Sequence, residues 1–364
     1  MGLAEIIRRY GAAYQAKYGT RMLPSHRVAM TAIAQCRTEA MGGHVYYCDQ
    51  CDEACYSYHS CQNRHCPKCQ HQAGQDWLER QQDLLLPVPY FMVTFTLPAA
   101  LRAVARSQQK LVYNLLFRTS AEALQQLARD QRFVGGQIGM VGVLHTWARD
   151  LSYHPHVHYL VPGGGLSADG QRWLRSGKQF LVHVKPLMKL FRAKFRTALQ
   201  KTDLFAQVPD QVWQRPWVVH CQPVGPGQAA LKYLAPYIFR VAISNNRIIS
   251  SDQAQVTFRY RPATGRKYRL CTLPTEAFIR RFLQHVLPKG FVKVRYYGLF
   301  SPSQRQQLQQ ARGLLGAQPT PPDPEGVPNP TVPDEPDRSI SCPKCRQPMR
   351  WLQRLKSQPQ RGPP

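Results

Sequence analysis

Acidic residues are scarce in this 364-residue sequence, which has 21 Asp and Glu against 48 Lys and Arg and a net charge of +27. An excess of this size along a whole chain indicates a polyanionic partner, because each neutralised phosphate releases a counterion. Nucleic acid is the first candidate and an anionic membrane surface the second. The hydrophobic fraction of 43% is ordinary, so we expect a packed core.

The sequence also lacks a secretory leader and a long uninterrupted apolar segment. Residues 1–10 are polar and carry two arginines. The longest uncharged stretch, residues 84–101, contains three prolines and alternates like a strand, which favours a buried sheet over a membrane span. We therefore expect a cytoplasmic protein with no membrane partner. Its 11 cysteines are then thiols and metal ligands rather than a disulfide framework.

Composition divides the chain into four segments. Residues 1–72 contain two expected helices, the second capped by Ser25, followed by a Cys/His cluster. Residues 73–316 alternate helical and strand-like patterns, which indicates an α+β domain. Residues 317–340 are rich in Pro, Asp and Glu and are typical of a linker, and residues 341–364 form a basic tail.

Two cysteine pairs with metal-ligand spacing lie in the first segment. Cys48 and Cys51 form one CxxC knuckle, and Cys66 and Cys69 form the other. Each knuckle directs two thiolates at one point, so together they predict a tetrahedral structural zinc site. This module would also bring Arg64 and Lys68 to DNA phosphates.

Other potential ligands surround these knuckles. They are either a second, interleaved zinc site or a mixture of core thiols and surface histidines: Cys36, His44, Cys61 and His65. The tail carries Cys342 and Cys345 in a further CxxC, which is only half a shell. These two either borrow ligands from elsewhere or bind no metal, and we do not count them as a site.

A histidine-rich strand is expected at residues 154–161. His156 and His158 are two apart, so their imidazoles lie on one face of a strand at roughly 6.6 Å and can converge on one metal ion. Val157 would point into the core. The third ligand stays open among His154, His145 and a carboxylate such as Asp150.

A tyrosine pair follows at Tyr233 and Tyr237, which would share one face of a helix. Taken alone, two such tyrosines are most often core residues, and Pro236 leaves the local geometry open. Beside a metal-binding strand in a basic chain, they fit another role. A phenol can attack a phosphodiester whose charge a metal ion neutralises, and the bond energy is then stored as a phosphotyrosine.

These motifs resemble those of the HUH endonucleases, in which His-hydrophobic-His precedes one or two catalytic tyrosines. The fuller resemblance, over residues 25–316, is to the two-tyrosine transposases of the insertion-sequence-91 family. The matching segments, in order, are Cys36-Arg37-Thr38, Gly42-Gly43-His44, Asn63–Cys69, Leu144-His145-Thr146-Trp147, His154–His158, Tyr233–Tyr237, Ser244–Ile248 and Arg295-Tyr296-Tyr297-Gly298.

The resemblance implies both a fold and a mechanism. An N-terminal zinc-binding domain would precede an HUH domain with a central antiparallel sheet flanked by helices. A tyrosine would attack the element's end on single-stranded DNA, forming a 5′-phosphotyrosine in a rolling-circle-like reaction. Mg²⁺ or Mn²⁺ on the histidines would polarise the phosphate, and the second tyrosine would carry out the second strand transfer. The partners would be transposon ends and target DNA in a bacterial cytoplasm, with no small-molecule substrate.

Basic and aromatic residues supply further candidate DNA contacts, although exposed strands with basic outer faces show the same pattern. The candidates are Lys232, Arg240, Asn246, Arg247, Arg259, Arg261, Arg295 and Tyr296. Two other functions remain open. A rolling-circle replication initiator or relaxase would use the same chemistry. A non-catalytic, zinc-dependent DNA-binding regulator would instead keep its function after loss of either tyrosine.

Overall fold

The computed structural model describes residues 2–69, 85–227, 229, 242–252, 254–262, 267–316 and 340–357. The chain forms two compact units, Met1–Gln70 with Thr320–Pro364 and His71–Pro319. Tyr233, Tyr237, Lys232 and Arg240 lie outside the described residues. Among the described helices, none combines the length and apolar character needed to cross a bilayer.

The first unit begins with helix α1 (Leu3–Tyr18), which a short 3-10 turn at Gly19–Arg21 follows. Helix α2 (Pro24–Gln35) comes next, followed by a second 3-10 turn at Glu39–Met41. Both helices bury apolar residues, including Ile6 of α1 and Ile33 of α2. The expected cap at Ser25 is wrong. Pro24 takes the first helical position, where its missing N–H costs nothing, and Leu23 precedes the helix.

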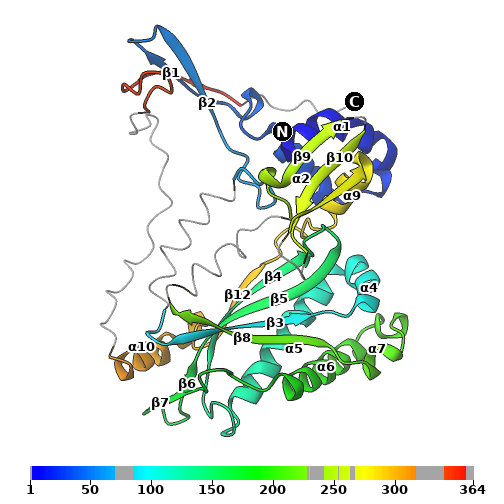
Figure 1. The fold of residues 1–364 in the computed structure, drawn as a ribbon, viewed down its shortest axis with the longest axis vertical. Coiled ribbons are helices and arrows are strands. Elements are labelled where there is room, and N and C mark those ends of the chain that lie inside the picture. Colours follow the sequence, from blue (N-terminus) through cyan, green and yellow to red (C-terminus); the bar gives the residue numbers. More distant parts are fainter. Residues whose placement is uncertain are drawn as a thin grey trace. The chain divides into compact units, whose positions relative to one another are not determined.

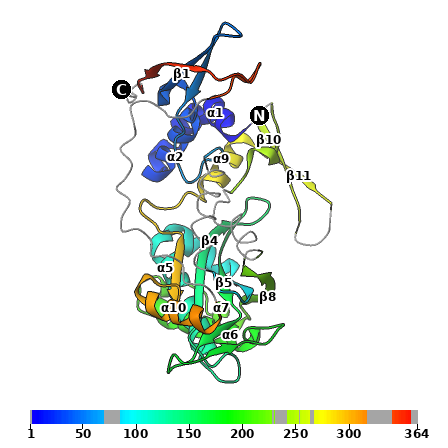
Figure 2. The same ribbon diagram turned by 90° about the vertical axis from the view of Figure 1, so that its left-hand side faces the viewer.

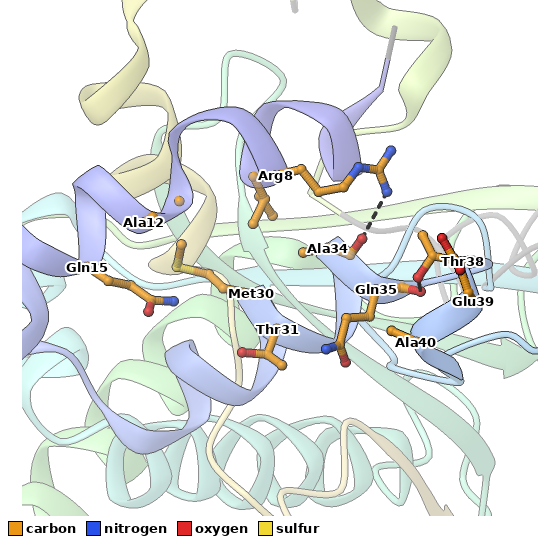
Figure 3. Close-up of a pocket in the computed structure, with 12 residues that line it drawn as sticks. Arg8, Ala12, Gln15, Met30, Thr31, Ala34, Gln35, Thr38, Glu39 and Ala40 are labelled. Atoms are coloured by element: carbon orange, nitrogen blue, oxygen red, sulfur yellow. Dashed lines mark hydrogen bonds between the residues drawn. The ribbon is translucent and has the colours of Figure 1, made fainter. Parts of the chain in front are cut away.

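A groove of about 590 Å³ runs between α1, α2 and the Glu39–Met41 turn. Figure 3 shows Arg8 reaching from α1 toward the end of α2, where it donates a hydrogen bond of 2.9 Å to the Ala34 carbonyl. Thr38 donates a 2.7 Å bond to the carbonyl of Gln35 at the same end. These bonds join the last turn of α2, whose carbonyls lack helical partners, to its neighbours.

The first unit also contains a three-stranded antiparallel sheet in the order β13-β1-β2. Its strands are β1 (Gly43–Cys48), β2 (Glu53–Tyr58) and β13 (Arg350–Leu355). The red C-terminal segment runs beside the blue β1 in both Figure 1 and Figure 2. The tail expected to be a separate segment therefore supplies an edge strand to the N-terminal module.

The second unit is built on a five-stranded antiparallel sheet in the order β12-β4-β5-β3-β8, which confirms the expected α+β fold (Figure 1). The strands are β3 (Pro89–Thr96), β4 (Gly139–Trp147), β5 (Tyr153–Pro162), β8 (Val218–Pro226) and β12 (Val294–Gly298). The three central strands are rich in β-branched and aromatic residues, which suit a pleated, buried surface. The uncharged stretch supplies β3, as expected.

Two helices, α5 (Gln109–Ala128) and α6 (Val184–Gln200), pack on one face of this sheet. Gly142 of β4 makes room for the Tyr159 ring, because a Cβ at Gly142 would lie 2.5 Å from that ring. The Tyr159 hydroxyl bonds to Ser120 Oγ at 2.8 Å and to the Phe117 carbonyl at 3.0 Å. This tyrosine therefore fastens α5 to the sheet.

On the opposite face of the sheet, the apolar cluster formed by the described residues covers only part of its length. Leu308 of α10 (Arg305–Leu314) and Phe300 pack there on a cluster that includes Met92, Val143 and Leu160. Side chains two residues apart on a strand share a face. Continuing along β4 and β5, the next residues on this face are therefore histidines.

The remaining elements of the second unit lie outside the five-stranded sheet. β6 (Gly164–Leu166) and β7 (Trp173–Arg175) form a hairpin, and β9 (Ile248–Asp252), β10 (Gln255–Tyr260) and β11 (Arg269–Pro274) form a small antiparallel sheet against α9 (Thr275–Leu283). Shorter helices are α4 (Arg102–Ser107) and α7 (Gln211–Gln214). The 3-10 turns are Ala99–Leu101, Phe205–Gln207, Asn245–Arg247 and Pro302–Gln304.

Candidate metal centres

Three histidines converge on this face of the sheet, next to the apolar cluster under α10. His156 of β5 lies opposite His145 of β4 in the strand register, and His158 follows two residues along β5. One ligand nitrogen from each of the three lies within 4.8 Å of the others. Burial alternates along β5 as expected, with Val157 fully buried in the core and the histidines facing the other way.

Hydrogen bonds orient two of these imidazoles. His156 Nδ1 lies 2.6 Å from the His154 carbonyl oxygen, which can only accept, so Nδ1 carries the proton and Nε2 is left as a ligand. His158 Nδ1 lies 2.9 Å from Thr94 Oγ1 on β3, its register partner. Such partners fix the tautomer and ring orientation of metal-binding histidines.

His154 shares this face of β5 but is oriented differently. Arg102 Nη2 lies 2.7 Å from His154 Nδ1. A guanidinium can only donate, so Nδ1 accepts and the proton of a neutral His154 lies on Nε2. Burial, followed by the nearby Arg102 charge, lowers the pKa of His154 and keeps it neutral. His154 therefore presents an N–H donor rather than a free lone pair, and it is not part of the three-histidine group.

The turn between β4 and β5 is held in a constrained conformation. Leu151 is fully buried with φ of 64°, a left-handed value that is costly for a leucine. Asp150 accepts bonds from the Ser152 backbone N–H (3.1 Å) and hydroxyl (2.8 Å), and despite its burial these lower the pKa of its carboxyl group. Asp150, one of the third-ligand candidates, is thus engaged in the turn and lies outside the histidine group.

The buried side chain of His285 links this turn to β4. Its Nε2 lies 3.1 Å from the Leu151 carbonyl, and its Nδ1 lies 3.2 Å from Thr146 Oγ1 on β4. Since the carbonyl accepts, Nε2 donates and Nδ1 accepts from the threonine. Burial lowers the pKa of His285 to about 4, so the ring is neutral near pH 7.

A pocket of about 430 Å³ opens over the three histidines. Its lining combines nitrogen ligands, a half-buried carboxylate, a cation and an aromatic hydroxyl, contributed by the histidines together with Trp147, Arg149, Asp150, His154 and Tyr260. Three imidazoles leave coordination positions open for an oxygen ligand, as in catalytic rather than structural sites. Three imidazole nitrogens are a donor set for a divalent transition-metal ion rather than for Mg²⁺, which prefers oxygen ligands.

A four-cysteine cluster lies in the first unit, formed by Cys36, Cys61, Cys66 and Cys69. The Cys36–Cys69 and Cys61–Cys69 sulfur distances are 3.5 and 3.6 Å. Sulfurs on a tetrahedral zinc ion with Zn–S bonds of about 2.3 Å lie about 3.8 Å apart, whereas a disulfide would require about 2.0 Å. A hydrogen bond from Cys61 and backbone N–H groups lower the pKa of Cys66 to about 5, which favours the thiolate.

This grouping corrects the one expected from the sequence. Cys48 and Cys51 do not join Cys66 and Cys69; their sulfurs cluster with those of the tail cysteines. The β1–β2 hairpin explains the separation, since Cys48 ends β1 opposite Glu53, and Cys61 follows the other end of the hairpin at Tyr58. Those ends are about 17 Å apart at the rise of a strand.

The expected histidine ligands are not part of the described cysteine clusters either. His44 Nδ1 accepts a 3.3 Å bond from Trp351 Nε1, and its ring meets His59 edge to face. The backbone N–H of His65 donates to Asn63 Oδ1 at 2.9 Å. The interleaved Cys₂His₂ alternative therefore gives way to an all-cysteine shell.

The candidate DNA contacts differ in their surroundings. Arg247 donates to the backbone carbonyls of Arg149 and Arg259, and Arg295 bonds Asn114 and lies 4.4 Å from the Phe117 ring centroid. Both therefore hold elements together. Arg64, Lys68 and Tyr296 are half-buried, whereas Asn246, Arg259 and Arg261 are exposed.

Sequence reasoning missed Thr94 and Arg102. Thr94 left a faint signal, because it is a polar residue within an otherwise apolar strand. Arg102 left none, since its role depends on α4 lying beside the start of β5. The tail cysteines did leave a signal: residues 342–345 and 66–69 are the same tetrapeptide, Cys-Pro-Lys-Cys.

Comparison with known proteins identifies relatives of both units. Residues 139–307 match a family model described as a putative transposase, and residues 6–97 match the transposase zinc-binding domain. The chain is 44% identical to the putative transposase y4qJ of Sinorhizobium fredii, over 86% of this chain and 84% of the relative. It is 27% identical to the transposase for insertion sequence element IS801 of Pseudomonas savastanoi pv. phaseolicola, over 75% and 69% of the two chains. No solved structure matches significantly.

Proposed function

The chain belongs to the insertion-sequence-91 family of transposases, and from this premise we propose that it cuts and rejoins single-stranded DNA through a covalent tyrosine–DNA bond. The observation that carries the proposal is the convergence of His145, His156 and His158 beneath an open pocket in a strongly basic chain. A phosphodiester needs charge neutralisation and an aligned nucleophile, and a metal ion held by these histidines would supply the first.

His145, His156 and His158 would hold the divalent ion, Mn²⁺ or Mg²⁺. The His154 carbonyl at His156 Nδ1 and Thr94 Oγ1 at His158 Nδ1 would orient these two rings before the substrate arrives. When bound, such an ion supplies Lewis-acid stabilisation of the charge on the scissile phosphate. His145 is therefore our choice among the third-ligand candidates.

His154 would contribute a hydrogen bond to the phosphate instead of a metal bond. Arg102 occupies its Nδ1, so Nε2–H is available to a non-bridging phosphate oxygen. The positive charge of Arg102 behind the ring makes this N–H a stronger donor without bringing a second cation into contact with the metal ligands. On one face of β5, His154 would thus donate a hydrogen bond to the phosphate, whereas His156 and His158 would bind the metal ion.

The covalent step falls to Tyr233 or Tyr237. The phenolic oxygen attacks phosphorus as its proton leaves, the bond from phosphorus to the 3′-oxygen breaks, and that oxygen takes up a proton. The products are a 5′-phosphotyrosine and a free 3′-OH. Reversal with a new 3′-OH reseals the strand without an external energy source, and a second tyrosine permits a second cleavage while the first end stays attached.

The four-cysteine cluster of Cys36, Cys61, Cys66 and Cys69 would bind a structural zinc ion, because four thiolates leave no open coordination position. Arg64 and Lys68 lie within the loop that this ion would fold, and we propose that the loop contacts DNA phosphates. The exposed Arg259 and Arg261 would add contacts from β10 and its turn.

The test is to incubate the purified chain with Mn²⁺ and a single-stranded oligonucleotide carrying an element end. We expect a covalent protein–DNA adduct that denaturing gels resolve and mass spectrometry assigns to Tyr233 or Tyr237. Each single Tyr→Phe variant should retain one adduct, and the double variant should form none.

Tyr260 provides the matched control, because its side chain lines the pocket above the histidines. Tyr260→Phe should leave the adduct in place. An adduct that persists in the Tyr233→Phe, Tyr237→Phe double variant and disappears on adding Tyr260→Phe would move the nucleophile to Tyr260. If DNA is bound but no adduct forms under any metal condition, the chain is a non-catalytic DNA-binding protein.

A further inference from the structure

A second four-cysteine cluster joins the two ends of the chain. It consists of Cys48, Cys51, Cys342 and Cys345, whose sulfurs all lie within 4.8 Å of one another. The Cys48–Cys345 and Cys51–Cys342 sulfur distances are 3.4 and 3.9 Å. These bracket the separation of about 3.8 Å expected on tetrahedral zinc and are far from the 2.0 Å of a disulfide.

The backbone around these cysteines repeats one pattern. The Cys48 sulfur accepts bonds from the N–H groups of Gln50 and Cys51, and the Cys342 sulfur accepts them from Lys344 and Cys345. The Cys66 sulfur of the other cluster does the same with Lys68 and Cys69. Three CxxC turns thus aim two backbone donors at their first sulfur, which is how a protein stabilises a metal-bound thiolate.

Left-handed residues complete the pattern. Asp52 follows Cys51 with φ of 54°, and Arg346 follows Cys345 with φ of 62°. In the other cluster, Arg37 follows Cys36 with φ of 58°, and Gln62 follows Cys61 with φ of 49°. Non-glycine residues seldom adopt these values, so their occurrence after a cysteine in both clusters indicates one shared construction rather than chance proximity of thiols.

Apolar packing alone is too small to hold the tail in place. Among the described residues, the core around this cluster has four buried side chains, Tyr46, Met349, Cys48 and Cys342, with apolar side chains such as Ile340 and Trp351 partly buried beside them. Other described contacts of the tail include the strand pairing of β13 with β1 and exposed ion pairs such as Arg350–Asp49 at 3.3 Å. Exposed pairs contribute little, and small modules of this kind usually depend on a metal for stability.

We propose that Cys48, Cys51, Cys342 and Cys345 bind a second zinc ion, so that the C-terminal tail is an integral part of the N-terminal zinc module. Residues 342–345 lie outside both family matches, which cover residues 6–97 and 139–307. The chain would then carry two structural zinc ions, and the second would close residues 48–345 into a loop. This site is independent of the chemistry proposed for the histidine face.

Cysteine protection in the unaltered full-length chain tests the proposal without any risk of misfolded variants. The protein is treated with iodoacetamide, with zinc bound or after chelation, and each cysteine is followed by mass spectrometry. We expect Cys342 and Cys345 to be alkylated at least ~10-fold more slowly with zinc, together with Cys48 and Cys51, because bound thiolates are poor nucleophiles. Cys271, which lies in neither cluster, is the internal control. Equal labelling of Cys342 with and without zinc overturns the proposal.

Cobalt substitution counts the sites. Co²⁺ bound by four thiolates gives a sulfur-to-metal charge-transfer band that a histidine site does not give. Cys342→Ser with Cys345→Ser should halve the band per chain, and Cys48→Ser with Cys51→Ser should halve it equally. Combining all four substitutions should cause no further loss. Cys221→Ser with Cys271→Ser should keep the full band, and a full band in the tail variant contradicts the second site.

Discussion

The two units contain candidate metal sites that differ in their side chains and in whether a coordination position is left open. In the first unit, each cluster offers four sulfurs, some of which accept bonds from backbone N–H groups of their own turns, and four thiolates would fill a tetrahedral zinc shell. In the second unit, one buried and two half-buried imidazoles lie on adjacent strands and line a pocket of about 430 Å³. The closed shells suit folding, whereas the open one suits a substrate oxygen.

The difference also lies in what holds the ligands. The loops that carry Cys48, Cys51, Cys342 and Cys345 would lose their shape without the ion, because the apolar cluster described around them is small. The histidines are placed by a sheet whose core packs against α5 and α6 whether or not a metal is present. Loss of a ligand should therefore affect folding in the first unit and chemistry in the second.

The largest effect expected from this contrast is in His158→Ala. Removing one of three imidazoles should lower strand cleavage at least ~100-fold, since charge on the phosphate is no longer neutralised in the transition state. The thermal midpoint and the affinity for the oligonucleotide should change little, because the side chain faces the pocket rather than the core. Cleavage gels at saturating DNA, binding titrations and thermal unfolding provide the three readouts.

His183→Ala is the matched control, because His183 is exposed and belongs to none of the metal clusters in the described chain. It should match the unaltered protein in all three measurements. If His158→Ala instead weakens DNA binding and leaves cleavage intact at saturation, these histidines serve recognition, and the contrast between closed and open sites is lost.

Sequence reasoning succeeded where the determinant was local. The two-residue spacing of His156 and His158 fixes their shared face on any strand, and Val157 is buried between them as predicted. The antiparallel sheet followed from the family resemblance and is also present.

Prediction from the sequence failed where segments far apart in the chain come together. The pairing of Cys48 with Cys342 depends on β13 adding to β1, and no spacing rule connects positions so far apart in the chain. The Ser25 cap failed for a different reason: two local signals competed, and the proline at position 24 took precedence. The role of Tyr233 and Tyr237 stays a prediction, since both lie outside the described residues.

A smaller effect is expected from Thr94→Val, which tests whether the open site is preorganised. Valine keeps the shape of threonine but removes the hydroxyl 2.9 Å from His158 Nδ1. Loss of such a partner typically weakens metal binding by about 10- to 100-fold. The Mn²⁺ concentration that gives half-maximal cleavage should rise by that factor, with cleavage at saturating Mn²⁺ largely retained. Thr94→Ser keeps the hydroxyl and should behave like the unaltered chain. An unchanged Mn²⁺ dependence in Thr94→Val means that β3 does not orient His158.

The smallest expected effect concerns His285, which contacts the turn beside the histidines, and it is a pH dependence of the free energy of unfolding. The pKa of buried His285 is lowered to about 4, against an ordinary value of 6.5. Between these values the unfolded chain binds a proton that the folded chain does not, so stability falls as pH is lowered from 6.5 toward 4. At pH 5.5 the loss relative to pH 7.5 should be roughly 1 kcal/mol. The main cause is burial, which penalises the charged imidazolium, and a proton on Nδ1 would also prevent it from accepting from Thr146.

Urea unfolding at pH 7.5 and 5.5 measures this loss for the unaltered chain, His285→Gln and the exposed control His183→Gln. A glutamine cannot titrate, so His285→Gln should be less stable at pH 7.5 but should lose about 1 kcal/mol less on acidification. His183→Gln should keep the full pH dependence. If both variants lose equal stability on acidification, another group carries the effect, and the Leu151 turn beside the histidines is not held by a neutral imidazole. The positions of the histidines would then be set by the sheet alone. The histidine site and the cysteine clusters would in that case differ only in the number of ligands that each offers.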